Sequence, residues 1–379
     1  VQTQAEQPPR HPLVKAPKDL SLAGRRILMV APCLGKFGGI EAFCLALAED
    51  LLRKDAEVTI LRKKVAGFAP NGSIENAEAE LLAGHPEEHA DRFASAYLPR
   101  LSLRLLREIG KAHLVHVHNA LFEVVSASRL TGKPCVATIY NWRRRNLSPR
   151  TLAWNAAASL ADRRWYISEF VWDSWEPRRR RPGSARLPVV SRMPAGHHPP
   201  DKRKGFLFLG RWIPNKGLRI LLQAYASLDL DPKTWPLTLA GDGPLRPEVE
   251  LFLRDHPLPG VRLAGFVSDE ERHRLTREAK WMVTPPHTNE DLGLTPLEAR
   301  AVSVPCIVSE DGGLKETGGP HALRCRPGEV KDLARVMLQA ARMNEEQYLR
   351  HSALAKEGLE DYVRPLHDYA REYLRLLAS

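Results

Sequence analysis

Short apolar runs alternate with amphipathic stretches from residue 25 onward, and this alternation predicts a parallel sheet covered by helices. The run 25–32 (RRILMVAP) predicts a buried strand, which a Gly-rich turn and a helix follow, and 56–61 (AEVTIL) predicts the next strand. Together they make one βαβ unit of a doubly wound sheet. Helix is predicted over 72–110, and further strands over 113–118, 134–140 and 163–168.

The pattern restarts at residue 205, after a stretch rich in Pro, Gly and Arg (178–204) that predicts a domain boundary. Strand-like runs again alternate with helical ones, and the chain ends in predicted helices. The predicted fold class is therefore α/β, with two Rossmann-like doubly wound domains facing across a cleft. The predicted parts are a disordered leader 1–22, an N-terminal domain 23–195, a C-terminal domain 203–358 and a terminal helix 359–379.

Composition and charge narrow the partners without choosing among them. The 379 residues carry a formal net charge of +11, which favours nucleic acid, phospholipid head groups or phosphorylated substrates. Five cysteines form no CxxC pair and no metal-ligand spacing, so buried thiols in a reducing compartment are predicted. No apolar run approaches the ~20 residues of a bilayer span and no signal-peptide pattern is present, so a cytoplasmic protein is expected.

Polar residues that follow strands would face the cleft, because the carboxyl ends of parallel strands and the helix N-termini meet there. Arg211 follows a predicted strand and Lys216 begins a helix, so both could bind a diphosphate. The alternative is two solvated basic residues near an Asn215 N-cap. Gly38 and Gly39 fall at the first βα turn, where glycine lets backbone N–H groups approach a phosphate or simply permits a tight turn.

Two histidines, His116 and His118, lie on one face at the C-terminal end of a predicted strand. His118 could hydrogen-bond a ligand, whereas a structural role is expected for His116. A metal pair would lack an evident third ligand. Two Gly-rich loops after strands, AGDGP (240–244) and DGGLKETGG (311–319), are weak signals by themselves.

The stretch TNEDLGLTPLEAR (288–300) holds Glu290 and Glu298, with seven residues between them. One interpretation is structural: Thr295 is the N-cap of a helix, Pro296 is its first residue and Glu298 completes a capping box. The other interpretation is that both carboxylates belong to a site.

Taken in order, seven segments resemble the retaining nucleotide-sugar glycosyltransferases of family four, which have the two-Rossmann GT-B fold. The resemblance is strong over 205–320 and weaker over 25–190. The glutamate pair with seven residues between is the signature of that family. The segments are GKFGGIEAF, HVHN, FLFLGRWIPNKGL, LAGDGPLR, VRLAGFVSDEE, EDLGLTPLEA and DGGLKE.

The resemblance implies a role for each matching residue. Glu298 would bind the donor ribose, Glu290 and His118 would face the donor sugar, and Arg211 and Lys216 would neutralise the diphosphate. The catalytic residues would be Glu290, His118, Arg211 and Lys216. The implied donor site comprises Gly38, Gly39, Arg211, Lys216, Gly241, Phe266 and Val267 (both beside the nucleobase), Glu290, Asp291, Leu292, Gly293, Leu294, Thr295 and Glu298. The terminal helix would cross back to the N-terminal domain.

The resemblance also implies that the sugar is transferred with retention of its anomeric configuration and without a metal or another cofactor. The acceptor would attack from the same face as the one from which the leaving phosphate departs. The segment TIYNWRRR (138–145) stands where relatives usually have a His-Asp type pair, so Asn141, Trp142 and Arg143 are candidates for the acceptor side. The expected acceptor is a glycan or a lipid-linked, lipopolysaccharide-type anionic molecule of envelope or polysaccharide biosynthesis.

The basic runs Arg143–Arg145, Arg178–Arg181 and Lys202–Lys204 are either solvated surface or contacts for an anionic acceptor or the inner face of a membrane. The competing hypotheses are a nucleic-acid-binding protein, a non-catalytic GT-B-like partner subunit and a sugar-nucleotide epimerase. The absence of a recognisable nucleic-acid-binding motif argues against the first. The intact glutamate pair argues against the second, and its spacing favours a transferase over an epimerase.

Overall fold

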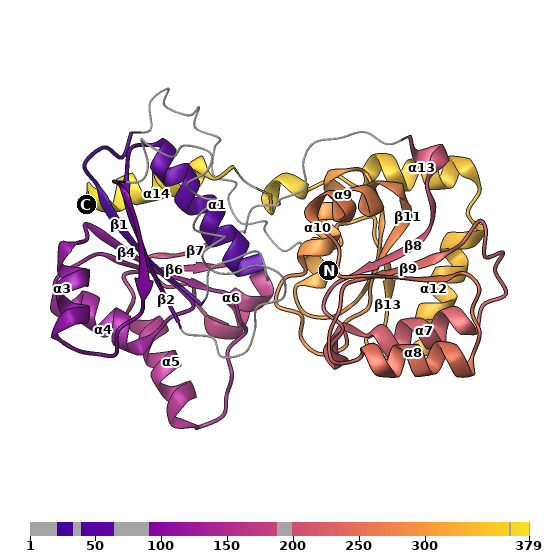
Figure 1. The fold of residues 1–379 in the computed structure, drawn as a ribbon, viewed down its shortest axis with the longest axis horizontal. Helices are drawn as coiled ribbons and strands as arrows, with labels where there is room; N and C mark the ends of the chain where they lie inside the picture. The colour runs from indigo at the N-terminus through magenta and orange to yellow at the C-terminus, as the bar shows by residue number, and fades with distance from the viewer. Residues whose placement is uncertain (1–20, 33–38, 64–90, 188–198, 364, 379) are drawn as a thin grey trace, which may run out of the picture.

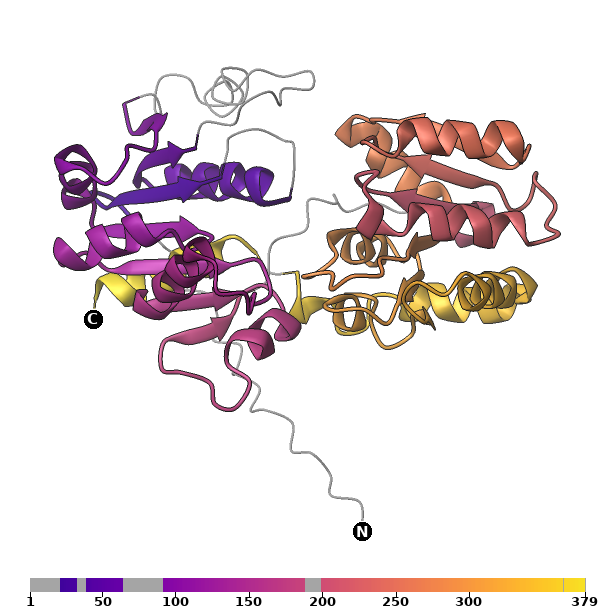
Figure 2. The same cartoon turned by 90° about the horizontal axis from the view of Figure 1, so that it is seen from below.

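The structure, a computed structural model, describes residues 21–32, 39–63, 91–187, 199–363 and 365–378. Gly38 and most of the predicted leader, residues 1–20, lie outside the described residues. Figure 1 shows two α/β domains side by side, the N-terminal one in indigo to magenta and the C-terminal one in red to yellow. Seen from below in Figure 2, each domain is a layered sheet with helices on both faces.

The described strands of the N-terminal domain form a parallel seven-stranded sheet in the order β3-β2-β1-β4-β5-β6-β7. Because β1 lies between β2 and β4, the chain reverses its direction of winding there, which is where ligands bind in such sheets. The strands are β1 (Arg26–Ala31), β2 (Glu57–Arg62), β3 (Phe93–Tyr97), β4 (Leu114–His118), β5 (Cys135–Ile139), β6 (Arg163–Tyr166) and β7 (Ser184–Arg186).

Helices cover both faces of this sheet, with α1 on one side and α3, α4 and α5 on the other (Figure 1). Serine side chains cap the N-termini of three of the helices. The hydroxyls of Ser102, Ser148 and Ser168 each accept a hydrogen bond from a backbone N–H of the first turn. The helices are α1 (Gly39–Arg53), α3 (Leu103–Lys111), α4 (Phe122–Leu130), α5 (Pro149–Leu160) and α6 (Glu169–Trp175).

The described strands of the C-terminal domain repeat the same order in a parallel six-stranded sheet, β10-β9-β8-β11-β12-β13. Its switch point lies between β8 and β11, since β8 pairs with both β9 and β11. The strands are β8 (Lys204–Leu209), β9 (Leu237–Ala240), β10 (Val261–Gly265), β11 (Ala279–Thr284), β12 (Cys306–Ser309) and β13 (Leu323–Cys325). The predicted α/β architecture of two doubly wound domains is confirmed.

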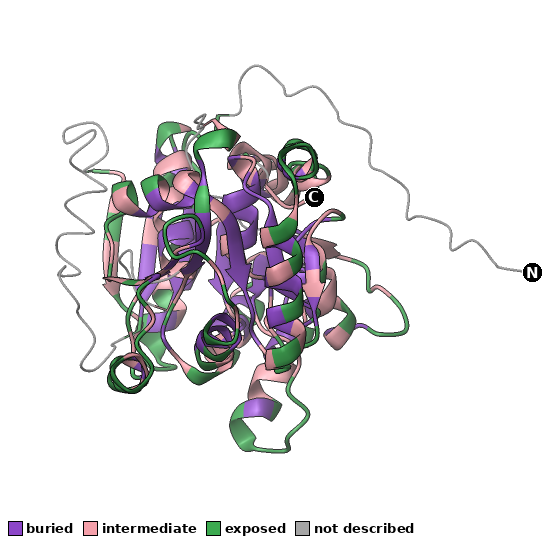
Figure 3. Cartoon of the chain, turned by 90° about the vertical axis from the view of Figure 1, so that its right-hand side faces the viewer, coloured by how far each residue is buried: buried purple, intermediate pink, exposed green. Residues whose placement is uncertain are grey.

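Two apolar clusters fill the C-terminal domain, one on each face of its sheet. Helices α7, α8 and α12 pack on one face, and α9 and α10 on the other. Figure 3 shows the strands as the most buried layer of the molecule. The elements are α7 (Leu218–Ala226), α8 (Arg246–Asp255), α9 (Asp269–Glu278), α10 (Leu294–Ala301), α11 (Leu314–Thr317), α12 (Val330–Arg342) and α13 (Glu345–Leu354), with 3₁₀ turns η1 (Pro200–Lys202), η2 (Pro214–Lys216) and η3 (Leu359–Asp361).

The last helix, α14 (His367–Leu377), belongs to the core of the N-terminal domain although it follows the C-terminal domain in sequence. Tyr369 and Tyr373 are fully buried there, and the ring of Tyr373 stacks on that of Trp165 with centroids 5.8 Å apart. Leu22, at the end of the predicted leader, is buried in the same core.

One element differs from its sequence-based prediction within the described residues. The helix predicted over 72–110 gives way to β3, which pairs in register with β2, and only α3 is helical in the described part of that range. The run Phe93–Tyr97 is only partly buried at the edge of the sheet, so it lacks the continuous apolar pattern that marks a central strand.

Candidate functional site

A glycine brings the loop after β8 against the end of β11. Gly217 has φ +74°, and a Cβ atom there would lie 1.9 Å from the carbonyl oxygen of Pro285, so only glycine allows this approach. The contact places Lys216, the last residue of η2, beside Glu290, and its Nζ donates to Oε2 at 2.6 Å. Two residues 74 positions apart are thus joined at the switch point of the sheet.

The loop that carries Glu290 is held from below by the turn after β12. The carboxylate of Asp311 accepts the backbone N–H groups of Asn289 and Glu290 at 2.9 and 2.8 Å. A Cβ atom on Gly312 would lie 2.1 Å from the carbonyl oxygen of Glu290, so the glycines of this turn allow it to pack under the loop. Sequence analysis noted these glycines but missed Asp311, whose place directly before them was the available signal.

Helix α10 begins at Leu294, and the predicted capping box is wrong. Its N-cap is Gly293, with φ +85°, and no side chain caps the helix. A capping box needs a hydroxyl or amide side chain at the N-cap, which glycine lacks, and Thr295 already lies inside the helix. Among the described residues, no side chain therefore accepts the first N–H groups of α10, which suits them to bind an anion.

Glu298 is buried, and its carboxylate forms an ion pair instead of a cap. Its Oε1 lies 2.7 Å from Nη1 of Arg272 on α9, and both side chains are at most 10% exposed. Asp269 holds the other side of the same guanidinium at 3.2 Å. Sequence analysis missed Arg272, because its neighbours on α9 are also charged and nothing in the pattern distinguishes it.

The two histidines of β4 have different surroundings. His116 hydrogen-bonds Tyr373 at 2.5 Å and Thr138 at 2.7 Å, so both ring nitrogens are satisfied, as its predicted structural role requires. His118 bonds Tyr140 through Nδ1 at 2.8 Å, while its buried Nε2 has no partner among the described residues. Burial lowers the pKa of His118 to about 3, which keeps its ring neutral.

The N-termini of α1 and α10 meet between the domains. Gly39 is the first residue of α1, and a Cβ atom on it would lie 2.5 Å from Cδ1 of Leu294. Leu292 is buried and joins the apolar core of the N-terminal domain. Both labelled helices lie on the facing sides of the two domains in Figure 1. Gly38, also predicted for this site, lies outside the described residues.

Two of the three acceptor-side candidates contact the C-terminal domain. Asp291 accepts hydrogen bonds from the side chain of Asn141 and the backbone N–H of Trp142, both at 2.8 Å. The guanidinium carbon of Arg143 lies 5.7 Å from the centre of the Trp175 ring. Two of the three candidates are therefore held by a residue that was predicted to contact the donor.

The remaining predicted donor residues lie around the ends of β8, β9 and β10. The guanidinium of Arg211 is exposed and has no polar partner among the described residues. Gly241 has φ +123°, and a Cβ atom there would lie 1.9 Å from the carbonyl oxygen of Gly210, so it is required for packing. Phe266, directly after β10, is 62% exposed, and Val267 is partly buried.

The basic runs are not uniform surfaces. Arg203 is buried and donates to the backbone carbonyl of Val302 at 2.8 Å, so part of one run is structural. Arg180 pairs with Glu169 and Asp173. Within the described part of the chain, no helix combines the length and apolar character that crossing a bilayer requires.

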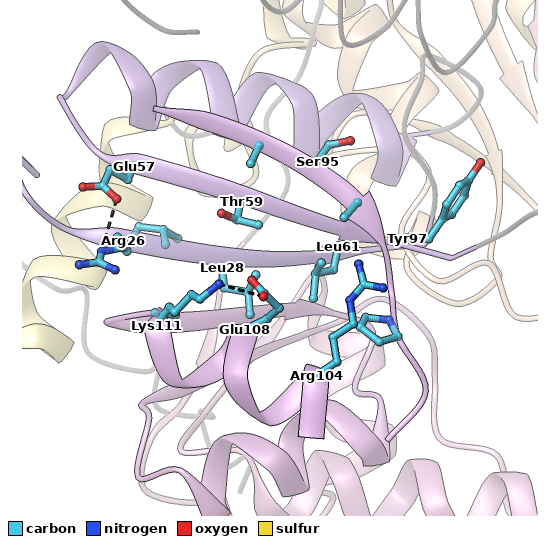
Figure 4. Close-up of a pocket in the computed structure, with 15 residues that line it drawn as sticks. Arg26, Leu28, Glu57, Thr59, Leu61, Ser95, Tyr97, Arg104, Glu108 and Lys111 are labelled. Carbon is cyan, nitrogen blue, oxygen red and sulfur yellow. Dashed lines mark hydrogen bonds and ion pairs between the residues drawn. The ribbon is translucent and has the colours of Figure 1, made fainter. Parts of the chain in front are cut away.

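A cavity of about 420 Å³ lies elsewhere, beneath β1, β2 and β3 beside α3. Figure 4 shows Thr59, Ser95 and Arg104 lining it, and the pairs Arg26–Glu57 and Lys111–Glu108 at its rim. None of the predicted donor residues borders it. Among the described residues, no group of three or more His, Cys, Asp or Glu side chains gathers as a metal site.

Comparison with known proteins adds independent findings. Residues 37–191 match the family described as Glycosyltransferase Family 4, and residues 191–356 match Glycosyl transferases group 1. An uncharacterized glycosyltransferase of Methanocaldococcus jannaschii is 32% identical over 135 residues, 35% of this chain and 37% of that protein. O-antigen chain mannosyltransferase B of Escherichia coli is 32% identical over 137 residues, 35% of this chain and 36% of that protein.

The matched part thus spans little more than a third of the length of these two relatives. A solved structure covers much more of the chain: Anabaena HepE in complex with UDP and glucose is 16% identical, with a TM-score of 0.70 over 93% of this chain and 99% of that one. At that identity the likeness shows a common fold.

Proposed function

The chain belongs to the glycosyltransferases of group 1 and family 4, which have the GT-B fold, and we propose that it transfers a sugar from a nucleotide-diphosphate sugar to a glycan or lipid-linked anionic acceptor. The observation that carries the proposal is the Lys216–Glu290 pair beside the uncapped N-terminus of α10. A fixed cation and free N–H groups suit a diphosphate, and a carboxylate at the same point suits the sugar attached to it.

The diphosphate would be neutralised from two sides. Arg211 is exposed and free of polar partners among the described residues, so its guanidinium is available to a phosphate. The ammonium of Lys216 has three N–H donors, so it can hold Glu290 and a phosphate oxygen at once. Together with the α10 N-terminus, these groups would stabilise the negative charge that develops on the leaving diphosphate.

The nucleoside would lie along the C-terminal domain. Glu298 would accept ribose hydroxyls, and its ion pair with Arg272 keeps its carboxylate in one orientation. Phe266 offers an exposed ring on which a nucleobase can stack. Anabaena HepE, which shares the fold, has been solved with UDP, which supports a nucleotide donor.

The sugar would lie between Glu290 and His118. The unpartnered Nε2 of His118 can bond a sugar hydroxyl, and a neutral ring does so without placing a positive charge beside an oxocarbenium-like transition state. The bond from the anomeric carbon to the phosphate oxygen breaks while the bond to the acceptor oxygen forms on the same face. The acceptor proton passes to the departing phosphate, so the product retains the configuration of the donor.

Protein cations and N–H groups supply the charge neutralisation in this scheme, so we propose that transfer needs no metal ion. For the acceptor, the likeness to an O-antigen chain mannosyltransferase of E. coli favours a polysaccharide or lipid-linked molecule. Leu147 is 82% exposed between the exposed Arg145 and Arg150, which favours contact with an anionic membrane surface.

A thermal-shift panel of UDP-, GDP-, ADP-, CDP- and dTDP-sugars, with and without Mg²⁺, tests the donor site first. A ligand at a hundred times its Kd adds ~2.7 kcal/mol to the stability of the folded state. One nucleotide should stand out without metal. If none does and an oligonucleotide shifts the melting temperature instead, the basic surface is the function and the transferase proposal fails.

Two further measurements test the retaining mechanism and the membrane contact. The anomeric proton coupling of the product in NMR should match that of the donor, and an inverted product would refute the retaining mechanism. Co-sedimentation should show binding to vesicles of phosphatidylcholine with phosphatidylglycerol but not to phosphatidylcholine alone. Equal binding to both would remove the electrostatic membrane contact.

A further inference from the structure

Asp291 follows Glu290 in the donor loop, yet its side chain reaches the other domain. Its Oδ2 accepts from Nδ2 of Asn141 and its Oδ1 accepts the backbone N–H of Trp142, both at 2.8 Å. The hydroxyl of Ser168 donates to its backbone carbonyl oxygen at 2.6 Å. Three polar groups of the N-terminal domain therefore converge on one residue of the C-terminal domain.

The hydrogen bonds continue from Asn141 to the strand end that carries His118. Nδ2 of Asn119 donates to Oδ1 of Asn141 at 3.3 Å, and Oδ1 of Asn119 accepts the backbone N–H of Tyr140 at 3.2 Å. The hydroxyl of Tyr140 in turn bonds Nδ1 of His118 at 2.8 Å. Since Asn119 directly follows His118, this chain of bonds links His118 to the loop of Glu290.

The chemistry of Asp291 fixes the direction of this chain. A carboxylate accepts only, so Asn141 must turn its NH₂ toward Asp291 and its oxygen toward Asn119. Burial raises the pKa of Asp291 to about 6, and the hydrogen bonds from Trp142 and Asn141 oppose that rise by favouring the ionised form. Each oxygen of this carboxylate is thus already directed at the N-terminal domain.

We propose that Asp291 and Asn141 are positioning residues for the transfer. Their hydrogen bond holds the Glu290 loop against the end of the strand that carries His118, so that both domains contact the donor sugar in one fixed geometry. This inference rests on the proposed function. It also reassigns Asn141 from the acceptor side to the domain contact. Small displacements of groups around a reacting centre are costly, which is why such a bond affects turnover.

A second interdomain carboxylate provides a matched comparison. Glu316 accepts the backbone N–H groups of Glu169 and Phe170 at 3.0 and 2.7 Å, at the start of α6. It is partly buried, as Asp291 is, and joins the same two domains through these two hydrogen bonds. Helix α6 carries none of the predicted site residues, and its N-cap Ser168 contacts only the backbone of Asp291. Glu316 therefore joins the domains without a direct bond to the chain that runs from Asp291 through Asn141 to His118.

Exchanging the two side chains tests the proposal without changing the net charge. Asp291→Asn points an NH₂ group at the NH₂ group of Asn141, and Asn141→Asp places a second carboxylate against the first. The double variant Asp291→Asn/Asn141→Asp restores a matched pair with its direction reversed. The new amide can accept from Trp142 and donate to the new carboxylate, which still accepts from Asn119.

The readouts are kcat and KM with whichever of UDP-glucose, GDP-mannose and ADP-glucose gives the largest thermal shift, and small-angle X-ray scattering of the full chain without nucleotide. We expect kcat to fall about tenfold in Asp291→Asn and further in Asn141→Asp, and to return to within about threefold of wild type in the double variant. The radius of gyration should rise in the single variants and fall back in the double variant.

The control is Glu316→Gln, which should lower the melting temperature while kcat stays within about twofold of wild type. Wild-type kcat in Asp291→Asn, no rescue in the double variant, or an equal loss of kcat in Glu316→Gln would each overturn the proposal. If Asn141→Asp does not fold, Asp291→Asn and the double variant still decide it. If no nucleotide binds, the proposed function fails, and the scattering comparison alone decides whether the pair joins the domains.

Discussion

The two sheets share one strand order but bring opposite chemistry to their switch points. The ends of β8 and β11 present Arg211, Lys216 and Glu290, all charged, and the loops around them are fixed by close glycine contacts. The ends of β1 and β4 present Gly39 and His118, and burial keeps that histidine neutral. A common fold thus separates two tasks: one domain can neutralise a diphosphate, and the other can bond an uncharged sugar.

The largest expected effect is on folding stability, at the buried Arg272–Glu298 ion pair of the C-terminal domain. Arg272→Met leaves the carboxylate of Glu298 buried without its partner, which costs about 3–5 kcal/mol of folding stability. The melting temperature in calorimetry should fall by about 5 °C for a chain of 379 residues.

The matched control for that pair is Arg274→Met, on the same helix but exposed and paired with exposed glutamates. It should leave the melting temperature unchanged, because exposed pairs contribute little. The double variant Arg272→Met/Glu298→Gln should recover part of the loss. Equal melting temperatures for Arg272→Met and Arg274→Met would show that the buried pair does not hold this side of the site.

The next effect is on turnover. Glu290→Gln keeps the shape of the side chain but removes its charge, so kcat should fall about a hundredfold or more, while the thermal shift with the nucleotide remains. Glu310→Gln changes an exposed carboxylate after β12 and should be silent. Steady-state kinetics of both variants checks this, and wild-type turnover in Glu290→Gln would remove the glutamate from the catalytic role.

Sequence alone predicted the fold because its central strands are continuous apolar runs. Most of the residues proposed for the donor site were chosen because they follow those strands. It failed where a tertiary partner decides the structure. Arg272 and Glu298 are 26 positions apart, and Asn141 and Asp291 are 150 apart, so no local spacing reveals either pair. The capping-box interpretation failed because its spacing is also compatible with a helix that starts at Leu294 with Gly293 as its N-cap.

The neutral switch point of the N-terminal domain, where His118 lies, can be tested through the pH dependence of folding stability. The folded pKa of His118 is about 3, below its ordinary value of 6.5, so only the unfolded chain takes up the proton between these values. The stabilising contribution of a neutral His118 is therefore lost as pH falls below about 6.5. His118→Gln should lose about 1 kcal/mol less stability than wild type between pH 7 and 5.5, as measured by urea unfolding.

The same variant should keep the shape of the pH–rate profile between pH 5 and 8, since the folded ring does not titrate there, although its kcat is lower. His116 provides the comparison, because burial also lowers its pKa but both its nitrogens are bonded within the protein. If a step between pH 5 and 8 occurs in the profile of only one of the two proteins, wild type or His118→Gln, then His118 carries charge during turnover. The division between a charged and a neutral switch point would then be wrong.

The smallest expected effect is on nucleotide affinity and concerns Phe266, the exposed aromatic residue after β10 in the C-terminal domain. Phe266→Ala should raise the Kd of the bound nucleotide about fivefold, since stacking a base on an aromatic ring contributes about 1 kcal/mol or more. The ring is 62% exposed, so its removal leaves little cavity and the melting temperature of the free protein should not change. Leu251→Ala, on an exposed face of α8 in the same domain, is the matched control for isothermal titration. If both variants bind the nucleotide as wild type does, the base lies away from β10, and charge alone positions the donor on this domain.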